Sequence, residues 1–226
     1  MIGDILPAAV AFAEAFADAP DPVLFAEEEA QIAHAVKKRR REFATGRHCA
    51  HTALGALGVP PAPLLRGDSG APLWPPGIVG SITHCAGYRA AAVARVGEVL
   101  TVGIDAEPDE SLTDEVLALI ALPAERARVR DLTIAAPGVS WDRLLFSAKE
   151  SVYKAWFPLA RRWLDLDDAD ITINAAEENS PDGTFEARLL VPAPVIGDAP
   201  LTGFAGRWLA RDGVIITAIT VPAPLA

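Results

Sequence analysis

The residues most suited to chemistry gather in two short segments. Lys149 and Lys154, two of only four lysines in the chain, flank the carboxylate of Glu150, whereas arginine supplies the other 16 basic residues. Upstream, Asp105 and Glu107 close an apolar run. Residues two apart on a strand share a face, so these carboxylates are expected to converge, which is costly unless a cation lies between them. Because oxygen ligands favour a hard ion, the pattern predicts a Mg²⁺ and phosphate site.

The segment around Glu150 is expected to be a helix over residues 140–156, and its spacing decides which side chains meet. Lys149 and Tyr153 share a face, and Glu150 precedes Lys154 in the favoured order for an i, i+4 ion pair. Solvated strand-end acids and a surface ion pair, worth roughly 0.3–0.5 kcal/mol, are the plainer alternative. If Glu150 instead completes the shell begun by the upstream acids, the set fits phosphate transfer or pyrophosphate cleavage.

Five successive cations at positions 37–41 interrupt an otherwise acidic chain. Arg39 and Arg47 are eight residues apart, a little over two helical turns, so they fall near one face of the helix expected there. Guanidinium groups match phosphates with paired hydrogen bonds. The cluster therefore suggests a local anion site, with a solvated helix face as the alternative.

A fourth group of candidates lies in the glycine-flanked segment from Gly80 to Cys85. The hydroxyls of Ser81 and Thr83 and the imidazole of His84 are small donors suited to phosphate oxygens. Adjacent residues on a strand point apart, so His84 and Cys85 are not expected to act as a pair. A structural histidine remains the alternative for His84.

Composition narrows the class of protein. The chain has 226 residues, 51% of them hydrophobic, which suffices for one large domain or two small ones. A net charge of −10 argues against general nucleic-acid binding. No apolar run reaches the length of a membrane span, and residues 1–19 suit an amphipathic helix better than a secretion signal. Cys49 and Cys85 lack any paired spacing, so reduced thiols in a cytoplasmic protein are expected.

The order of expected elements is helix, short strands, helix, short strands. Helices are expected over 25–57 and 113–120, an irregular segment over 122–139, and a hairpin around Gly97-Glu98. The tail is expected to be rich in strands, with turns at Asp182-Gly183 and Asp212-Gly213. This order predicts an α+β fold with small antiparallel sheets, arranged as two similar halves.

Four segments, in this order and with suitable gaps, resemble the 4′-phosphopantetheinyl transferases. Within that family they look like the subclass that includes the enterobactin synthetase component and the mycobacterial and streptomycete enzymes. The two central motifs stand here as Gly103-Ile104-Asp105-Ala106-Glu107 and as Trp141 followed by Phe146 to Lys154. The arginine segment at 39–47 and the segment at 80–85 also match. Ser151 stands where alanine is commoner, and the resemblance covers about residues 25 to 220.

The resemblance implies transfer of the phosphopantetheine arm of coenzyme A to a serine of an acyl or peptidyl carrier protein, with release of 3′,5′-ADP. Asp105, Glu107 and Glu150 would hold Mg²⁺, or Mn²⁺ in its place, on the pyrophosphate. Glu150 would also act as the base for the carrier serine, directly or through a water. Lys149 and His84 would neutralise the pyrophosphate as charge builds.

The resemblance also implies how the nucleotide part of coenzyme A is held. Arg39 and Arg47 would take the 3′-phosphate, Arg66 would lie near the adenine, and Ser81 and Thr83 would line the nucleotide pocket. Lys154 would be either a phosphate ligand or the ion-pair partner of Glu150.

The implied fold consists of two pseudo-twofold-related halves, residues 1–103 and 104–226, with the active site in the cleft between them. An internal pseudo-dimer favours a monomer, and a cytoplasmic location with no nucleic-acid or membrane partner is expected. The segment with Arg126, Arg128 and Arg130 is a candidate surface for the carrier protein, and a solvated loop is the alternative. A non-catalytic coenzyme A-binding module and a Mg²⁺-dependent nucleotide hydrolase are the competing functions.

Overall fold

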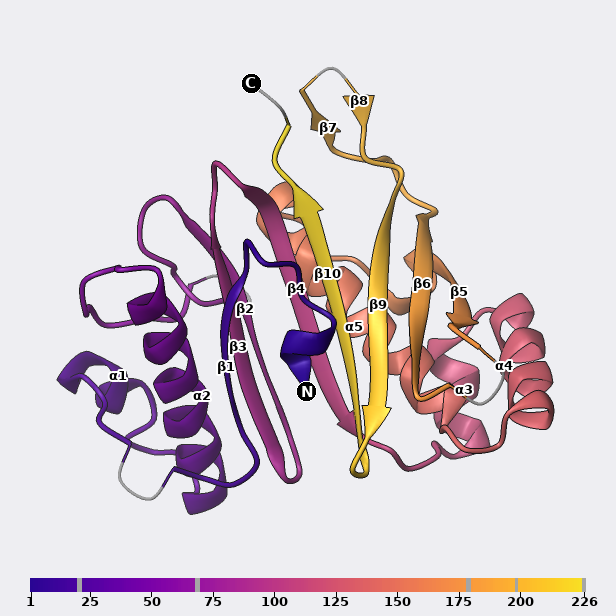
Figure 1. Cartoon of the computed structure of the whole chain (residues 1–226), viewed down its shortest axis with the longest axis horizontal. Coiled ribbons are helices and arrows are strands. Elements are labelled where there is room, and N and C mark those ends of the chain that lie inside the picture. Colours follow the sequence, from indigo (N-terminus) through magenta and orange to yellow (C-terminus); the bar gives the residue numbers. More distant parts are fainter. Residues whose placement is uncertain (20–21, 68–69, 178–179, 198, 225–226) are drawn as a thin grey trace.

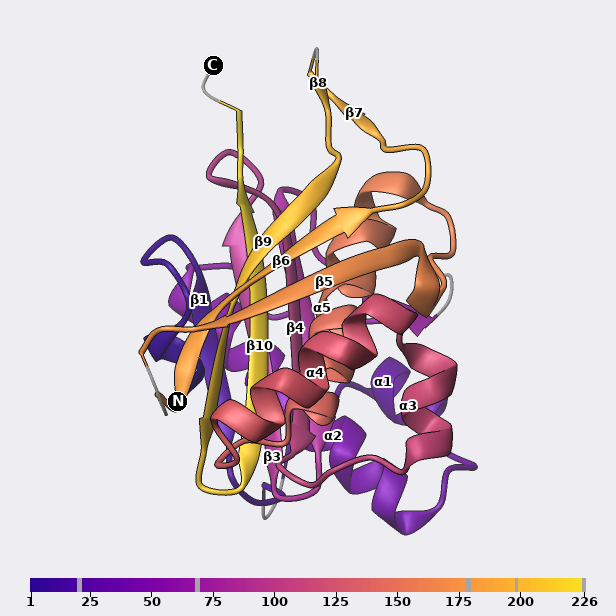
Figure 2. The ribbon, with the colours of Figure 1, turned by 90° about the vertical axis from the view of Figure 1, so that its right-hand side faces the viewer.

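Two antiparallel sheets lie side by side and carry the principal helices on one side (Figures 1 and 2). The computed structural model describes residues 1–19, 22–67, 70–177, 180–197 and 199–224. The smaller sheet has the order β1-β3-β2 and the larger the order β4-β10-β9-β6-β5. Helix α2 packs on the smaller sheet and helix α5 on the larger one. The expected α+β architecture with small antiparallel sheets is therefore confirmed.

The first part of the chain builds the smaller sheet and its helices. Its elements are η1 (Ile2–Asp4), β1 (Ala11–Ala15), α1 (Ala26–Gln31), α2 (Lys37–Ala56), β2 (Ile78–Cys85) and β3 (Tyr88–Arg95).

The second part builds the larger sheet, which α5 crosses. Its elements are β4 (Val99–Pro108), α3 (Asp114–Ile120), α4 (Pro123–Ala135), α5 (Trp141–Ala160), η3 (Leu166–Asp168), β5 (Ala169–Ala175), β6 (Asp182–Leu189), β7 (Val195–Ile196), β8 (Ala199–Pro200), β9 (Gly203–Arg211) and β10 (Val214–Pro222).

The N-terminal segment is not the amphipathic helix that its apolar spacing predicted. It forms strand β1, which pairs with β3 from Ala11 opposite Val93 to Ala15 opposite Arg89. The hydroxyl of Tyr88 donates to Glu14 at 2.6 Å and ties this strand to the start of β3. The prediction was wrong because pairing with a distant strand, which local spacing does not encode, outweighed the helix propensity of an alanine-rich segment.

Four other local predictions need correction. The helix expected over 25–57 is two helices, α1 and α2, and the segment expected to be irregular over 122–139 contains helix α4. Gly97-Glu98 is not a hairpin, because β3 and β4 belong to different sheets. The hairpin instead joins β2 to β3, with Gly87 at a φ of 78°. Asp182-Gly183 lies at the start of β6 rather than in a turn.

The turn predicted at Asp212-Gly213 is confirmed. Both residues have positive φ, 53° and 75°, between the paired strands β9 and β10. Two consecutive left-handed residues match the twist of a tight hairpin, and Asp-Gly is a favoured pair for it.

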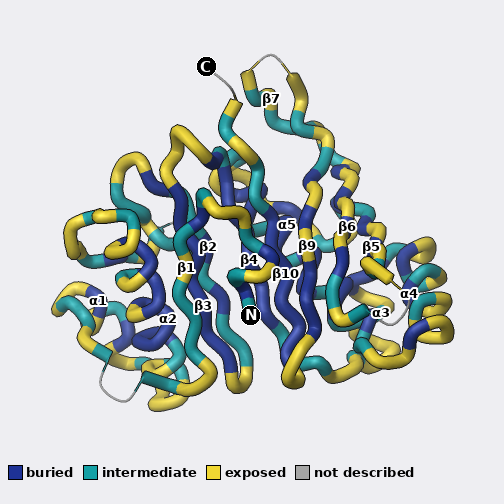
Figure 3. The backbone as a smooth tube through the Cα atoms, in the orientation of Figure 1, coloured by how far each residue is buried: buried dark blue, intermediate teal, exposed yellow. Residues whose placement is uncertain are grey.

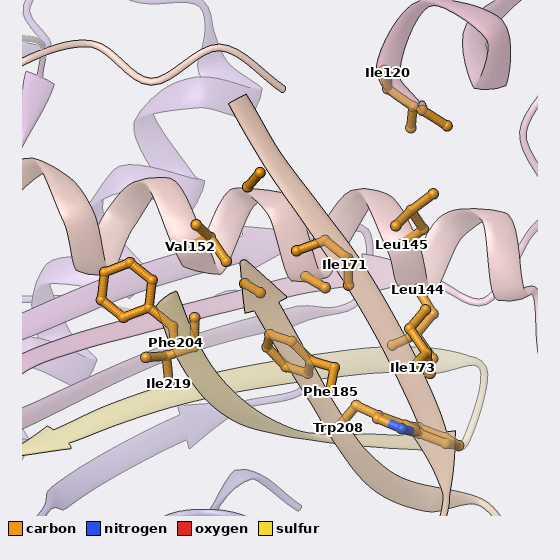
Figure 4. Packing of buried hydrophobic residues seen from close by; sticks show 14 of the residues in the cluster. Ile120, Leu144, Leu145, Val152, Ile171, Ile173, Phe185, Phe204, Trp208 and Ile219 are labelled. Atoms are coloured by element: carbon orange, nitrogen blue, oxygen red, sulfur yellow. The ribbon is translucent and has the colours of Figure 1, made fainter. Parts of the chain in front are cut away.

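The apolar core fills the space between the sheets and the helices. In Figure 3 the buried segments, drawn in dark blue, follow the central strands and the inner faces of α2 and α5. The largest apolar cluster lies between α5 and the larger sheet, where Val152 and Leu144 face Phe185 and Trp208 (Figure 4). Across the described residues, no helix is both long and apolar enough to cross a membrane. Cys49 and Cys85 are free, as expected.

Candidate active site

Three carboxylates from β4 and α5 converge where the two sheets meet. Asp105 is 5% exposed on β4, and Glu107 and Glu150 are half-buried. Burial raises the pKa of Glu107 and of Glu150, and the charge of Asp105 raises both further. Asp105 is therefore close enough to each of the other two acids to repel it, and its nearness to Glu107 agrees with their spacing on β4.

The two oxygens of Asp105 have different surroundings. Oδ1 accepts hydrogen bonds from the Lys154 ammonium at 2.7 Å and from the Thr83 hydroxyl at 3.3 Å. Oδ2 is buried and has no hydrogen-bond partner among the described residues. The Lys154 ammonium also donates to the carbonyl of Ile104 at 3.1 Å, so it turns to Asp105 and β4 rather than forming an ion pair with Glu150.

Close packing of α5 against β4 brings Glu150 and Lys154 to Asp105. A Cβ on Gly103 would lie 2.1 Å from the carbonyl oxygen of Ser151 and 2.8 Å from the nitrogen of Ala155. Both are backbone atoms, which cannot move without moving the helix. The glycine two residues before Asp105 is therefore what lets the helix approach the strand.

We expect Gly103→Ala to separate α5 from β4, lowering stability by about 1–3 kcal/mol and reducing activity because Glu150 moves away from Asp105. Denaturant unfolding and an activity assay check both effects. Gly97→Ala is the matched control, since a Cβ there meets nothing within 4 Å. Equal effects of the two substitutions would contradict this account.

The hydroxyls of Ser81 and Thr83 join the two sheets. Ser81 accepts from the backbone N–H of Ile104 at 3.1 Å, and Thr83 accepts from that of Ala106 at 2.9 Å. Both side chains lie on β2 and are buried, 4% and 2% exposed. Their hydroxyls therefore hold β4 beside β2, and Thr83 also orients Asp105. In this structure they bind the protein's own backbone, although Ser81 still borders the cavity described below.

On the side of the smaller sheet, two arginines stack on one aromatic ring, and the charge of Arg39 lies close to both. The guanidinium of Arg47 lies 4.5 Å from the centre of the Phe43 ring, and that of Arg66 lies 5.0 Å from it. Burial, together with the charges of Arg66 and Arg39, lowers the pKa of Arg47 to about 10, and the charge of Glu28 opposes this shift. Repulsion among cations held this close favours an anion between them. The helix spacing thus correctly placed Arg39 near Arg47, and the structure adds Arg66.

His84 is paired with Arg39. Its Nε2 lies 2.6 Å from Nη1 of Arg39, which is a permanent donor, so Nε2 acts as the acceptor and the ring is neutral. Burial and the charge of Arg39 lower the pKa of His84. In this structure the ring is therefore an acceptor that orients Arg39, and its neutralising role at the pyrophosphate, implied by the family resemblance, stays a prediction.

Lys149 requires a correction, because it points away from the carboxylates. Its ammonium is buried inside the second half, where it donates to the carbonyls of Leu166 at 2.5 Å and Ala169 at 2.8 Å and pairs with Glu125 at 2.9 Å. Burial lowers the pKa of Lys149, and Glu125 opposes that shift. Neighbouring residues on a helix diverge by about 100°, so Lys149 lies inside while Glu150 faces the cleft.

Arg143 is a site residue that the sequence reasoning missed. Its Nη1 lies 3.2 Å from Glu107, and its Nε donates to the carbonyl of Glu110 at 2.9 Å. Arg143 precedes Glu150 by seven residues, which is two helical turns and the same face. The seven-residue spacing between Arg143 and Glu150 could have identified Arg143 from the sequence.

Of the three acids, Glu150 borders a cavity of about 460 Å³ between the two halves. From the first half, Trp74, Gly80 and Ser81 line it. From α5, its walls include Glu150, Tyr153, Lys154 and Phe157. The cavity thus combines an apolar wall with a carboxylate and an ammonium, which suits a ligand with both apolar and anionic parts.

As they stand in this structure, the acids do not form a closed metal cage. No group of three or more histidine, cysteine, aspartate or glutamate side chains within the described residues lies close enough together to hold a metal ion.

The segment with Arg126, Arg128 and Arg130, expected as a loop, belongs to helix α4. There Arg128 pairs with Asp170 and donates to the Ile171 carbonyl.

Both parts of the chain match a known family. Residues 27–94 match the 4′-phosphopantetheinyl transferase N-terminal domain, and residues 101–191 match the 4′-phosphopantetheinyl transferase superfamily. The chain therefore belongs to the 4′-phosphopantetheinyl transferases, enzymes that move the phosphopantetheine group of coenzyme A to carrier proteins.

Individual relatives agree along nearly the whole chain. The sequence is 55% identical to the 4′-phosphopantetheinyl transferase Svp of Streptomyces mobaraensis, over 99% of this chain and 90% of the relative. It is 49% identical to the 4′-phosphopantetheinyl transferase PptT of Mycobacterium tuberculosis, over 98% of each. Enterobactin synthase component D of Escherichia coli K12 is 36% identical over 60% of this chain and 66% of its own length.

Proposed function

We propose that the cleft between the two sheets binds coenzyme A and that the transfer takes place at Asp105, Glu107 and Glu150. The observation that carries the proposal is the convergence of these acids beside Lys154, across from the Arg39–Arg47–Arg66 cluster. A ligand with two separate phosphate groups, such as coenzyme A, matches the arginine cluster at one site and, at the other, Lys154 with the cation that the three acids would hold. The cavity with Tyr153 and Phe157 in its wall supplies an apolar surface beside Glu150 and Lys154.

The donor chemistry of these acids suits a divalent cation, which would have to draw them closer together than they lie in this structure. Oδ2 of Asp105 is buried without a hydrogen-bond partner among the described residues, and this carboxylate raises the pKa of both neighbouring acids. Asp105, Glu107 and Glu150 would hold Mg²⁺, or Mn²⁺ in its place, through oxygens alone. The ion would supply charge neutralisation at the pyrophosphate.

Glu150 is the group placed to accept a proton from the carrier serine, directly or through a water. Burial and the charge of Asp105 raise its pKa, which brings a carboxylate closer to the pH at which it must act as a base. The serine oxygen then forms a bond to the β-phosphorus, and the bond from that phosphorus to the bridging oxygen breaks. The products are the phosphopantetheinyl serine and 3′,5′-ADP.

The arginine cluster is the proposed site of the 3′-phosphate, with Arg39 and Arg47 as its ligands and Arg66 toward the adenine. Lys154 is the proposed neighbour of the pyrophosphate, because it already neutralises Asp105. This assignment leaves His84 to orient Arg39, and it gives no phosphate contact to Lys149.

We also propose the partner protein, the location, the oligomeric state and the division into halves. The partner is an acyl or peptidyl carrier protein, for which Arg126 and Arg130 are the docking candidates on α4, since Arg128 is engaged by Asp170. The protein acts as a cytoplasmic monomer, with halves at 1–103 and 104–226. That division falls within β4, whose first residues already pair with β10.

The test of the proposed function is intact-mass analysis of an apo acyl carrier protein after incubation with this protein, coenzyme A and Mg²⁺. We expect the carrier to gain one phosphopantetheine and EDTA to abolish the gain. Cleavage of coenzyme A without a carrier would instead indicate a nucleotide hydrolase. Binding of coenzyme A with no gain on any of several carriers would indicate a binding module.

A further inference from the structure

Glu28 carries a fully buried charge that the proposed reaction does not use. Its side chain is 0% exposed. Its Oε2 accepts from the N–H of Phe25 at 3.0 Å, and its Oε1 accepts from the N–H of Leu64 at 2.9 Å and lies 2.9 Å from Nε2 of His51. A buried carboxylate is tolerated when it is hydrogen-bonded and paired with positive charge.

The arginine that pairs with Glu28 is Arg47, a member of the cluster formed by Arg39, Arg47 and Arg66. Nε of Arg47 lies 3.8 Å from Oε1 of Glu28 and has no hydrogen-bond partner within the described residues. Arg47 is 5% exposed and stacks on the Phe43 ring that Arg66 also covers. Leu64, whose N–H Glu28 binds, stands two residues before Arg66. One carboxylate thus restrains both segments that carry these guanidinium groups.

Electrostatics gives Glu28 a second effect on the same cluster. The charges of Arg39 and Arg66 oppose the positive charge of Arg47, and the charge of Glu28 supports it. Without a negative charge on the inner side, the guanidinium groups would repel one another with no ligand present. A site held in its binding geometry beforehand loses less free energy on binding.

We propose that Glu28 is a positioning residue for the arginine site: its buried carboxylate holds Arg47, and through Leu64 the Arg66 segment, ready for a phosphate monoester. The inference rests on the proposed function, because it takes the 3′-phosphate of coenzyme A as that ligand. Glu28 itself touches no substrate.

The chain contains a matched control in its other half. Glu125 is 1% exposed, accepts from the N–H of Leu122 at 2.7 Å and from that of Ile171 at 2.8 Å, and pairs with Lys149. Like Glu28, it stands at the third position of its helix and binds the backbone N–H of the N-cap residue. Glu28 and Glu125 therefore have the same structural role, but Glu125 has no contact with the arginine cluster.

The experiment compares the dissociation constants of coenzyme A and 3′-dephospho-coenzyme A, measured by calorimetry on the full chain. Glu28→Gln is expected to weaken coenzyme A binding about tenfold, which corresponds to ~1.4 kcal/mol, and to leave 3′-dephospho-coenzyme A unchanged. Glu125→Gln is expected to lower stability without changing the ratio of the two constants. In an Arg47→Gln background, Glu28→Gln should have no further effect on that ratio.

Each outcome decides a separate point. If the wild-type protein binds both ligands equally, the 3′-phosphate assignment of the arginines fails, and the inference with it. If Arg47→Gln removes the discrimination but Glu28→Gln keeps it, the role of Glu28 is overturned while the proposed function stands. If Glu28→Gln does not fold, Glu28→Asp replaces it. That variant keeps the charge but withdraws the carboxylate by one methylene, and a smaller selective loss is expected.

Discussion

Glu150→Gln is expected to lower the rate of phosphopantetheine transfer by about 10²–10⁴-fold while the protein stays folded. The glutamine keeps the shape of the side chain but cannot accept a proton as a base, and it removes one of the three acids proposed to hold the cation. Glu150 is half-buried, and its pKa is raised by burial and by Asp105, so loss of its charge relieves repulsion rather than breaking an ion pair.

The measurement is transfer to an apo carrier protein under single-turnover conditions, with thermal unfolding on the same sample. Glu115→Gln removes one carboxylate from a fully exposed position on α3 and serves as the control for net charge. Near-normal transfer by Glu150→Gln would remove this residue from the mechanism. A large drop in both transfer and stability would indicate a structural role.

Lys149→Met is expected to destabilise the protein by about 3–5 kcal/mol, because it leaves the buried carboxylate of Glu125 without its cation. The Lys149 side chain is 1% exposed and that of Glu125 is 0% exposed, so water cannot replace the lost partner. Denaturant unfolding measures the loss. The double variant Lys149→Met with Glu125→Gln should recover part of it, since no unpaired charge then stays inside.

The same variants decide between a structural and a catalytic Lys149. With the double variant folded, transfer per molecule is expected to stay within several-fold of wild type. If Lys149 neutralised the pyrophosphate in the transition state, transfer would fall by about 10²–10³-fold even in a stable protein, as it does when a charge-stabilising donor is removed. A stable but inactive double variant would therefore contradict the placement of Lys149 inside the second half.

Elements with strong local signals were predictable from the sequence. Residues close together in the sequence determine both the apolar period of α5 and the Asp212-Gly213 turn, and the structure has both. Strand β1 and the break between α1 and α2 were not predictable, because they depend on pairing with β3 and on packing across the fold. Helix α4 was missed because Leu122 stands at its N-cap, where the usual polar capping residue would have marked the start.

The candidate site divides in the same way. Strand alternation placed Asp105 with Glu107, and helix spacing placed Arg39 near Arg47, since both rules concern one element at a time. The direction of Lys149 could not be read from its helix, because two faces of α5 are buried against different partners. Thr83 both holds β4 and orients Asp105. These two roles depend on the contact between the two sheets, so the residues next to Thr83 in the sequence do not predict them.

The matched roles of Glu28 and Glu125 show one structural device put to two uses within a single fold. In each half a glutamate closes the first turn of a short helix and receives the N–H of a later segment, and the long helix beside it has 20 residues in both cases. The acid is a glutamate in both halves, whereas its cationic partner differs: it is Arg47 in the first half and Lys149 in the second. The same local arrangement thus holds one cation at the proposed anion site and keeps the other as an internal anchor, so a change of cation, without a change of fold, changes what the arrangement does.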